Sequence, residues 1–352
     1  MMEAAIQKKV VLKDYVHTPG GSCMVTALSG IYRYHGLNFS AEQIVGLGAG
    51  LHFAYGYNPA QKNYRVEFIS SQLFYSLLCN TGTFGEEYEF DDSGKALQRM
   101  FRLLDQGMPV PVMLNPLFCE GLMKRTPAQF VEYIPSHMVV AYGYDLEERQ
   151  VFLYDSPQFN PVTMDLDTFI EARCSGPTLP VNKHYEFYFP EVVYPYEVSV
   201  KLAVSKVVQF FKYSEKHLAH KSGIQAIRRF SGNVQSWRNI FSDTEIADNA
   251  RLFLMAVTNG HATKGAFRTQ YSIFLKQASE KLNGGGFYES SNAYYYLGKL
   301  WIQFQKYLTL LIENPGAAEI WKEKSDFCQL LDEICEKEIA AIDLLEQNLM
   351  KN

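Results

Sequence analysis

The sequence predicts an α+β fold in two domains: a mixed domain over residues 1–195 and an all-helical domain over residues 196–352. Strand-like and helix-like patterns alternate up to about Pro195, and beyond it only the helical spacing of apolar residues continues. The chain has 352 residues, of which 47% are hydrophobic and 20% are charged. A chain of this length and composition is expected to fold and to bury more than one core.

The first predicted helix begins at a cysteine. Residues 19–21 (Pro-Gly-Gly) interrupt regular structure, and apolar residues then recur at helical spacing from Met24 until Gly36, which suits a left-handed C-cap. Cys23 therefore lies at a helix N-terminus, where unpaired N–H groups and the helix dipole favour the thiolate. The alternative is a cysteine buried on an apolar helix face, which is the commoner place for a free thiol.

A hairpin is predicted where two apolar runs flank a charged turn. The first run starts at His137 and continues to Tyr144, and the second covers residues 150–154 and ends at Asp155. Antiparallel pairing places the start of one strand beside the end of the other. We therefore expect the His137 imidazole and the Asp155 carboxylate to be hydrogen-bond partners.

The remaining elements follow from caps, breakers and periodicity. In the mixed domain we predict helices over residues 95–106 and 165–173, and strands over residues 109–114 and 185–189. In the helical domain, six segments have helical spacing: 198–213, 216–230, 244–257, 266–281, 291–313 and 317–350.

A glycine-rich segment, Gly46-Leu-Gly-Ala-Gly50, follows a short helix that starts after Ser40. Because glycine has no Cβ, two backbones can approach each other closely at such residues. We expect this segment to pass close to the helix that begins at Cys23.

Charge and cysteine spacing argue against several classes of protein. The net charge is −5, so no global positive field draws the chain to nucleic acid or to an anionic membrane. No apolar run approaches 18 residues and no signal peptide is recognisable, so we expect a cytoplasmic protein with no membrane partner. The six cysteines show no zinc-like spacing, so we predict reduced thiols and no metal site.

The chain contains the three groups that cysteine hydrolases and acyltransferases need. These are a thiolate, a histidine that pairs with it and transfers the proton, and a group that orients the histidine. Such enzymes also need donors for the oxyanion that develops on the substrate. Cys23, His137 and Asp155 occur in the chain order of papain-like enzymes, each in a suitable local context.

Four segments resemble a known family: Gly20–Leu28, Tyr34–Ser40, Gly46–Tyr55 and Gly265–Leu275. The two domains of that family to which they correspond together cover nearly the whole chain. The first three segments are similar to the N-terminal domain of the butirosin-biosynthesis protein H family, whose members are papain-like acyltransferases. The last resembles the helical domain that follows in that family. The resemblance implies a papain-like cysteine-protease fold, with Cys23 as nucleophile, His137 as base and acid, and Asp155 as the orienting group. We expect the Phe267–Phe274 group to pack against the first domain.

Other residues have weaker claims on the site. His17 lies six positions before Cys23, where papain-like enzymes commonly carry a glutamine whose N–H completes the oxyanion hole. We therefore treat His17 as the candidate oxyanion donor, with a packing role as the alternative, and His52 and Asp145 as alternative site residues. The other cysteines are predicted to be structural: Cys79, Cys119, Cys174, Cys328 and Cys335.

The leading functional hypothesis is a cysteine-dependent acyltransferase of natural-product biosynthesis. Cys23 would accept an acyl group from a carrier-protein thioester, on a phosphopantetheine arm, and pass it to a small-molecule amine, with no bound cofactor. The second hypothesis is a peptidase or amidase that uses the same residues with water as acceptor. The third is a non-catalytic scaffold in which Cys23 belongs to the core.

Overall fold

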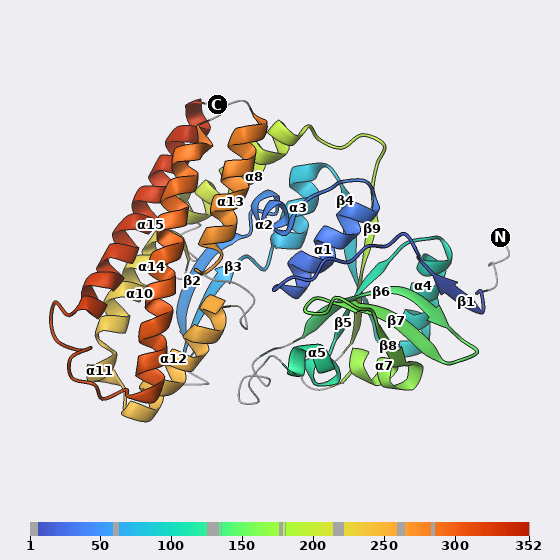
Figure 1. The fold of residues 1–352 in the computed structure, drawn as a ribbon, viewed down its shortest axis with the longest axis horizontal. Helices are drawn as coiled ribbons and strands as arrows, with labels where there is room; N and C mark the ends of the chain where they lie inside the picture. The colour runs from blue at the N-terminus through green and yellow to red at the C-terminus, as the bar shows by residue number, and fades with distance from the viewer. Residues whose placement is uncertain are drawn as a thin grey trace. The chain divides into compact units, whose positions relative to one another are not determined.

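The computed structural model of the chain describes residues 6–58, 63–124, 134, 136–175, 179, 181–213, 222–258, 265–282 and 286–351. Its contacts form two compact units. Unit 1 comprises Met1–Ala41 and Thr83–Glu191, and unit 2 comprises Glu42–Gly82 and Val192–Asn352. Figure 1 shows the larger sheet in unit 1 and the long helices in unit 2, which confirms the α+β prediction.

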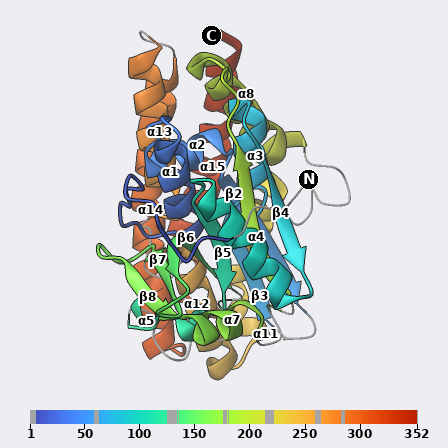
Figure 2. The same ribbon diagram turned by 90° about the vertical axis from the view of Figure 1, so that its right-hand side faces the viewer.

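Unit 1 is built on one antiparallel sheet. Its strands are β1 (Lys9–Val11), β4 (Phe84–Phe90), β5 (Val110–Leu114), β6 (His137–Asp145), β7 (Gln150–Asp155), β8 (Val162–Asp165) and β9 (Asn182–Tyr188). Their order is β4-β9-β5-β6-β7-β8, and β1 pairs with β6. Figure 2 shows β4 and β9 running alongside each other. The predicted hairpin is the β6–β7 pair, and the other two predicted strands are β5 and β9.

Helices cover both faces of this sheet. They are α1 (Cys23–Tyr34), α4 (Ser93–Asp105), the 3-10 turn η1 (Pro116–Phe118), α5 (Glu120–Met123) and α7 (Leu166–Arg173). Residues of α4 and α7 share one buried apolar cluster with alternate residues of β5, β6 and β7. Tyr142 of β6 and Tyr154 of β7 are intervening residues, which point away from this cluster. They pack around Tyr15, which also contacts Tyr34 of α1. Because successive strand residues point to opposite faces, α1 lies on the other side of the sheet from α4 and α7.

Unit 2 combines helices with one two-stranded hairpin. Its elements are α2 (Ala41–Leu47), β2 (Leu51–Asn58), β3 (Asn63–Ile69), α3 (Leu73–Thr81), α8 (Tyr196–Tyr213), α10 (Gly223–Gln235), α11 (Trp237–Ile240), α12 (Asp243–Thr258), α13 (Arg268–Lys281), α14 (Phe287–Glu313) and α15 (Asp326–Lys351). Figure 1 shows α13, α14 and α15 side by side. Within the described part of the chain, no helix has both the length and the apolar character needed to cross a membrane.

Residues 42–82 depart from the predicted domain organisation. We predicted them within the domain over residues 1–195, but they pack with the helices that follow residue 195. The β2–β3 hairpin buries Phe53 and Phe68, whose rings contact Phe230 and Trp301 with centroids 4.8–6.0 Å apart. The apolar face of this hairpin therefore belongs to the core of unit 2.

The glycine-rich segment packs closely against other parts of unit 2. A Cβ added to Gly46 would lie 2.0 Å from the Phe274 ring, and one added to Gly48 would lie 2.9 Å from the Leu73 side chain. Within unit 2, the close approach that these glycines allow is therefore to the Phe274 and Leu73 side chains. Phe274 thus packs against Gly46, a residue that we predicted in the first domain. Both residues belong to unit 2 of the structure.

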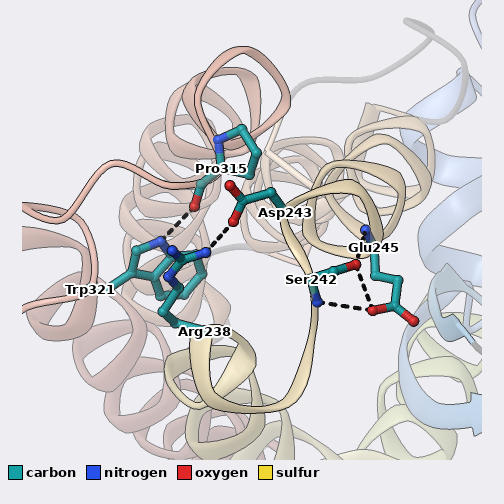
Figure 3. Close-up of polar contacts among 6 residues, drawn as sticks. All are labelled: Arg238, Ser242, Asp243, Glu245, Pro315 and Trp321. Atoms are coloured by element: carbon teal, nitrogen blue, oxygen red, sulfur yellow. Dashed lines mark hydrogen bonds and ion pairs between the residues drawn. The ribbon is translucent and has the colours of Figure 1, made fainter.

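Local polar contacts fix the turn between α11 and α12 (Figure 3). The Arg238 guanidinium pairs with the Asp243 carboxylate at the start of α12. Glu245 Oε2 accepts the backbone N–H of Ser242 at 2.9 Å and the hydroxyl of the same residue at 2.8 Å. A carboxylate that reaches back to the residue before the helix satisfies donors that the helix itself leaves unpaired.

Candidate active site

Cys23 is the first residue of α1, and the loop before it is fixed to the sheet. Ser22 is the N-cap, and the first turn contains no acidic residue to offset the positive end of the helix. The Gly20 N–H donates to the Ser156 carbonyl, just beyond β7, at 2.8 Å. A Cβ at Gly20 would lie 2.3 Å from Thr26 Oγ1, so this close approach requires glycine.

His137 and Asp155 are brought together by the pairing of β6 with β7. Asp155 lies opposite Val139, and its Oδ1 is 2.5 Å from Nε2 of His137 at the start of β6. The two side chains are 4% and 5% exposed. The predicted hydrogen bond between them is thus confirmed. Because Nε2 contacts Asp155, Nδ1 is the ring nitrogen left for the hydrogen bond between His137 and the Cys23 thiol.

The surroundings favour the charged forms of the thiol and the imidazole. Burial is the largest influence on the pKa of Cys23 and raises it, but hydrogen bonds with His137 and with the N–H groups of Met138 and Met24 bring the pKa below its usual value. Burial by itself lowers the pKa of His137, whereas Asp155 and Cys23 raise it above its usual value. Cys23 as a residue is partly exposed, whereas its thiol lies among the groups that lower its pKa.

His17 lies beside the end of β7. Its ring stacks on Tyr154 with centroids 4.9 Å apart and 16° between the planes. Neither ring nitrogen has a hydrogen-bond partner in the described part of the chain. Burial lowers the pKa of His17. Backbone groups of residues 155, 156 and 158 lie near the ring, outside hydrogen-bond geometry, and only partly oppose this effect. The ring is therefore neutral near pH 7 and retains one N–H for a ligand.

Two family models match the chain. Residues 22–156 match the model described as butirosin biosynthesis protein H, N-terminal, and residues 171–351 match a domain of unknown function, DUF4872. The chain belongs to the butirosin biosynthesis protein H family. A comparison with curated proteins found no match. The N-terminal match of this family begins one residue before Cys23 and ends one residue after Asp155, whereas His17 precedes it.

Family membership relates the chain to butirosin biosynthesis, and the family name is that of a biosynthetic protein. Cys23, His137 and Asp155 lie within the part that matches the N-terminal family model. Among the described residues, no group of three or more His, Cys, Asp or Glu side chains is arranged to hold a metal ion.

The sequence did not predict that a second thiol, that of Cys119, lies beside the candidate active site. Cys119 follows η1, is 5% exposed, and places its Sγ 3.9 Å from the Asn115 carbonyl. Burial, and then the charges of Asp155 and Cys23, raise the pKa of Cys119, so it lies near enough to both to interact electrostatically. A raised pKa keeps this thiol neutral and poorly nucleophilic. The one sequence signal for this location is that Cys119 follows β5 closely, and β5 pairs with β6, the strand that begins at His137.

The two alternative site residues have other contacts. Asp145, at the far end of β6, pairs with Lys9 at 2.8 Å and accepts backbone N–H groups of the β6–β7 turn. His52 lies on β2 in unit 2, where its ring packs on Phe210 with centroids 4.0 Å apart. Burial lowers the pKa of His52 to about 4, with a further contribution from Arg268. These contacts are those of structural residues.

Proposed function

We propose that the protein is a cysteine-dependent acyltransferase that acts through an acyl-Cys23 intermediate. The observation that carries this proposal is the series of contacts from the Cys23 thiol to the His137 ring and from that ring to Asp155. A helix-start thiol with a lowered pKa, paired with a buried histidine whose pKa is raised, is typical of an activated nucleophile.

In the first half-reaction, Cys23 Sγ attacks the carbonyl carbon of an acyl thioester. A new carbon–sulfur bond forms, and negative charge develops on the carbonyl oxygen. The bond to the leaving thiol then breaks as the His137 imidazolium gives its proton to that sulfur. The products are acyl-Cys23, neutral His137 and the free thiol of the donor. Asp155 keeps the ring oriented and stabilises its charged form throughout.

In the second half-reaction, a neutral amine attacks the acyl-Cys23 carbonyl. His137 takes the amine proton as the carbon–nitrogen bond forms, and Cys23 leaves as a thiolate. The amide product is released, and the thiolate–imidazolium pair is restored. Exchange between two thioesters is nearly isoenergetic, so formation of the amide drives the sequence forward.

The oxyanion requires hydrogen-bond donors that point at the position where the negatively charged carbonyl oxygen will lie. The backbone N–H of Cys23 is one, because the first N–H groups of a helix have no partner within it. The unpartnered ring of His17, fixed by Tyr154 beside the end of β7, supports it as the second donor.

We propose a thioester on the phosphopantetheine arm of a carrier protein as the donor and a small-molecule amine as the acceptor. Biosynthetic family membership supports transfer over hydrolysis. The same three residues also suit a peptidase or amidase, in which water replaces the amine. The scaffold alternative is weakened because Cys23 is partly exposed and its pKa is lowered, unlike a core thiol.

The test is intact-mass analysis after incubation with acyl-pantetheine thioesters. We expect one acyl group per chain in the wild type, none in Cys23→Ala, and one in Cys119→Ser, the matched variant at the neighbouring thiol. Addition of an amine should discharge the adduct into an amide. Peptide turnover without an amine would instead establish the hydrolase. An unreactive thiol with neither activity would leave only the scaffold.

A further inference from the structure

Arg173, the last residue of α7, is a buried cation without a polar partner. It is 0% exposed, and none of Nε, Nη1 and Nη2 has a hydrogen-bond partner among the residues that the structure describes. Within the described part of the chain its recorded contact is the ring of Phe169, whose centroid lies 5.5 Å from Cζ. A buried charge without a counter-charge or hydrogen bonds is strongly unfavourable, so another group must compensate it.

His184 is a second buried group with an unsatisfied atom near this position. It is 0% exposed, and its Nε2 contacts Glu186 Oε1 at 3.0 Å, whereas Nδ1 has no hydrogen-bond partner in the described part of the chain. Arg173 contributes to lowering the pKa of His184, so the two side chains are close enough to interact. The sheet supports this placement, because His184 pairs with Val112 of β5 and the Ala172 carbonyl accepts the N–H of the residue after β5.

The charges around Arg173 and His184 do not cancel: one positive charge, that of Arg173, has no negative partner in the part of the chain that the structure describes. Glu186, the carboxylate that contacts His184, already forms a two-pronged ion pair with Arg99, at 2.8 Å and 2.5 Å. The Cys174 thiol interacts with Arg173 electrostatically, but no carboxylate among the described residues is paired with this guanidinium. The negative end of α7 supplies only about half an elementary charge.

We propose that Arg173 and His184 hold a small inorganic anion inside unit 1. A water molecule would satisfy hydrogen bonds but would not balance the charge, whereas an anion does both. Both side chains are fully buried, so a compact, enclosed ion fits this place better than the carboxylate of a larger substrate. The guanidinium supplies the donors. His184 Nε2 donates to the Glu186 carboxylate, so Nδ1 can donate to the anion only in the charged ring, a form that a bound anion would itself favour.

Occupancy of this site would stabilise the turn that borders the candidate active site. Asn115 N–H donates to the Ala172 carbonyl at 2.7 Å, and the Asn115 side chain donates to Ser175 Oγ at 3.1 Å. The anion thus holds the end of α7 against the segment that leads to Cys119. This role is independent of whether Cys23 transfers or hydrolyses.

The test is thermal unfolding of the full chain, purified without halide. Tm is measured as sodium chloride replaces sodium gluconate stepwise at constant ionic strength. We expect a saturable rise in Tm of roughly 2–4 °C, as linkage of an ion to the folded state requires. Arg173→Met should lose this rise. The matched control is Arg149→Met, which removes an exposed arginine paired with Asp167 of α7. This variant should keep the chloride-dependent rise in Tm.

Bromide in a crystal of the wild type gives a second readout that does not depend on a variant. An anomalous peak within contact distance of the Arg173 guanidinium is the expected result. Equal Tm values in the two salts together with no bromide peak would overturn the proposal. So would a chloride response of the same size in Arg173→Met.

Discussion

Each unit contains a buried ion pair, and the two pairs have different surroundings. His137 and Asp155 in unit 1 are 2.5 Å apart, and Arg268 and Glu338 in unit 2 are 2.7 Å apart, with all four side chains at most 5% exposed. The first pair contacts the thiol of Cys23, a partly exposed residue at a helix start. A buried ion pair alone therefore does not distinguish the two units; the first pair differs by its hydrogen bond to a cysteine thiol.

The unit 2 pair is enclosed by aromatic rings and a backbone carbonyl. The Arg268 guanidinium lies over the rings of Phe68 and Trp301, 5.4 and 5.7 Å from their centroids, and donates to the His52 carbonyl at 3.1 Å. The indole N–H of Trp301 donates to Glu338 at 2.7 Å. These contacts join β2, β3, α13, α14 and α15, so the pair fixes the core of unit 2. The comparison predicts that variants of one pair change catalysis and variants of the other change stability.

The largest expected effect is that of Asp155→Asn on turnover. The amide can still contact the His137 ring, but it carries no negative charge to stabilise the imidazolium. We expect kcat/KM to fall by roughly 10⁴, as in the serine-protease template. Asp145→Asn, at the other end of β6, is the control and should leave turnover near that of the wild type. Wild-type turnover in Asp155→Asn would contradict the proposal that the first ion pair acts in catalysis and the second in stability.

Next in size is the loss of stability in Arg268→Met. This change leaves the Glu338 carboxylate buried and unpaired, which should lower the free energy of unfolding by about 3–5 kcal/mol. Urea unfolding followed by tryptophan fluorescence measures it, because all three tryptophans lie in unit 2: Trp237, Trp301 and Trp321.

A control variant separates the charge from the packing at this position. Arg268→Met/Glu338→Leu removes both charges and should recover much of the lost stability. The rate of Cys23 alkylation in the folded protein should not change in either variant. A folded Arg268→Met protein that had lost this reactivity would contradict the assignment of the pair to structure alone.

The smallest expected effect is that of His17→Ala. Loss of one oxyanion donor should slow acyl transfer by about 10²–10³, while the Cys23 thiol stays reactive toward iodoacetamide. His35→Ala is the matched control, because His35 stacks on Phe189 at the end of α1. Steady-state turnover and alkylation are measured on the same samples. If His17→Ala turns over like the wild type, the ring only packs against Tyr154.

Local signals predicted most of the elements and the three residues of the candidate site. Gly36 has φ of 84°, as its C-cap role requires, and Asp92 accepts the N–H of Lys95 at the start of α4. The β6–β7 hairpin brought His137 to Asp155 because antiparallel pairing is fixed by neighbouring sequence. Each of these features depends on residues that are close along the chain.

The features that the sequence did not reveal depend on contacts distant along the chain. The alternating pattern of β2 and β3 does not say that Phe53 and Phe68 meet Trp301, more than 200 residues later. The position of Cys119 near Cys23 depends on a turn after β5. Arg173 resembles an ordinary basic residue in the last turn of a helix, and only the folded sheet shows that it is buried.

The most direct test of the account is the pH dependence of Cys23 alkylation. It is measured by peptide mapping in a Cys79→Ser background, which removes an exposed competing thiol. Because the pKa of Cys23 is lowered and that of His137 is raised, the thiolate–imidazolium pair should already exist well below the ordinary thiol pKa of about 8.5. We therefore predict rapid labelling at mildly acidic pH, with the onset moved to the ordinary thiol range in His137→Ala. Labelling of wild-type Cys23 that rises only near pH 8 to 9, about where a free thiol ionises, would contradict the account.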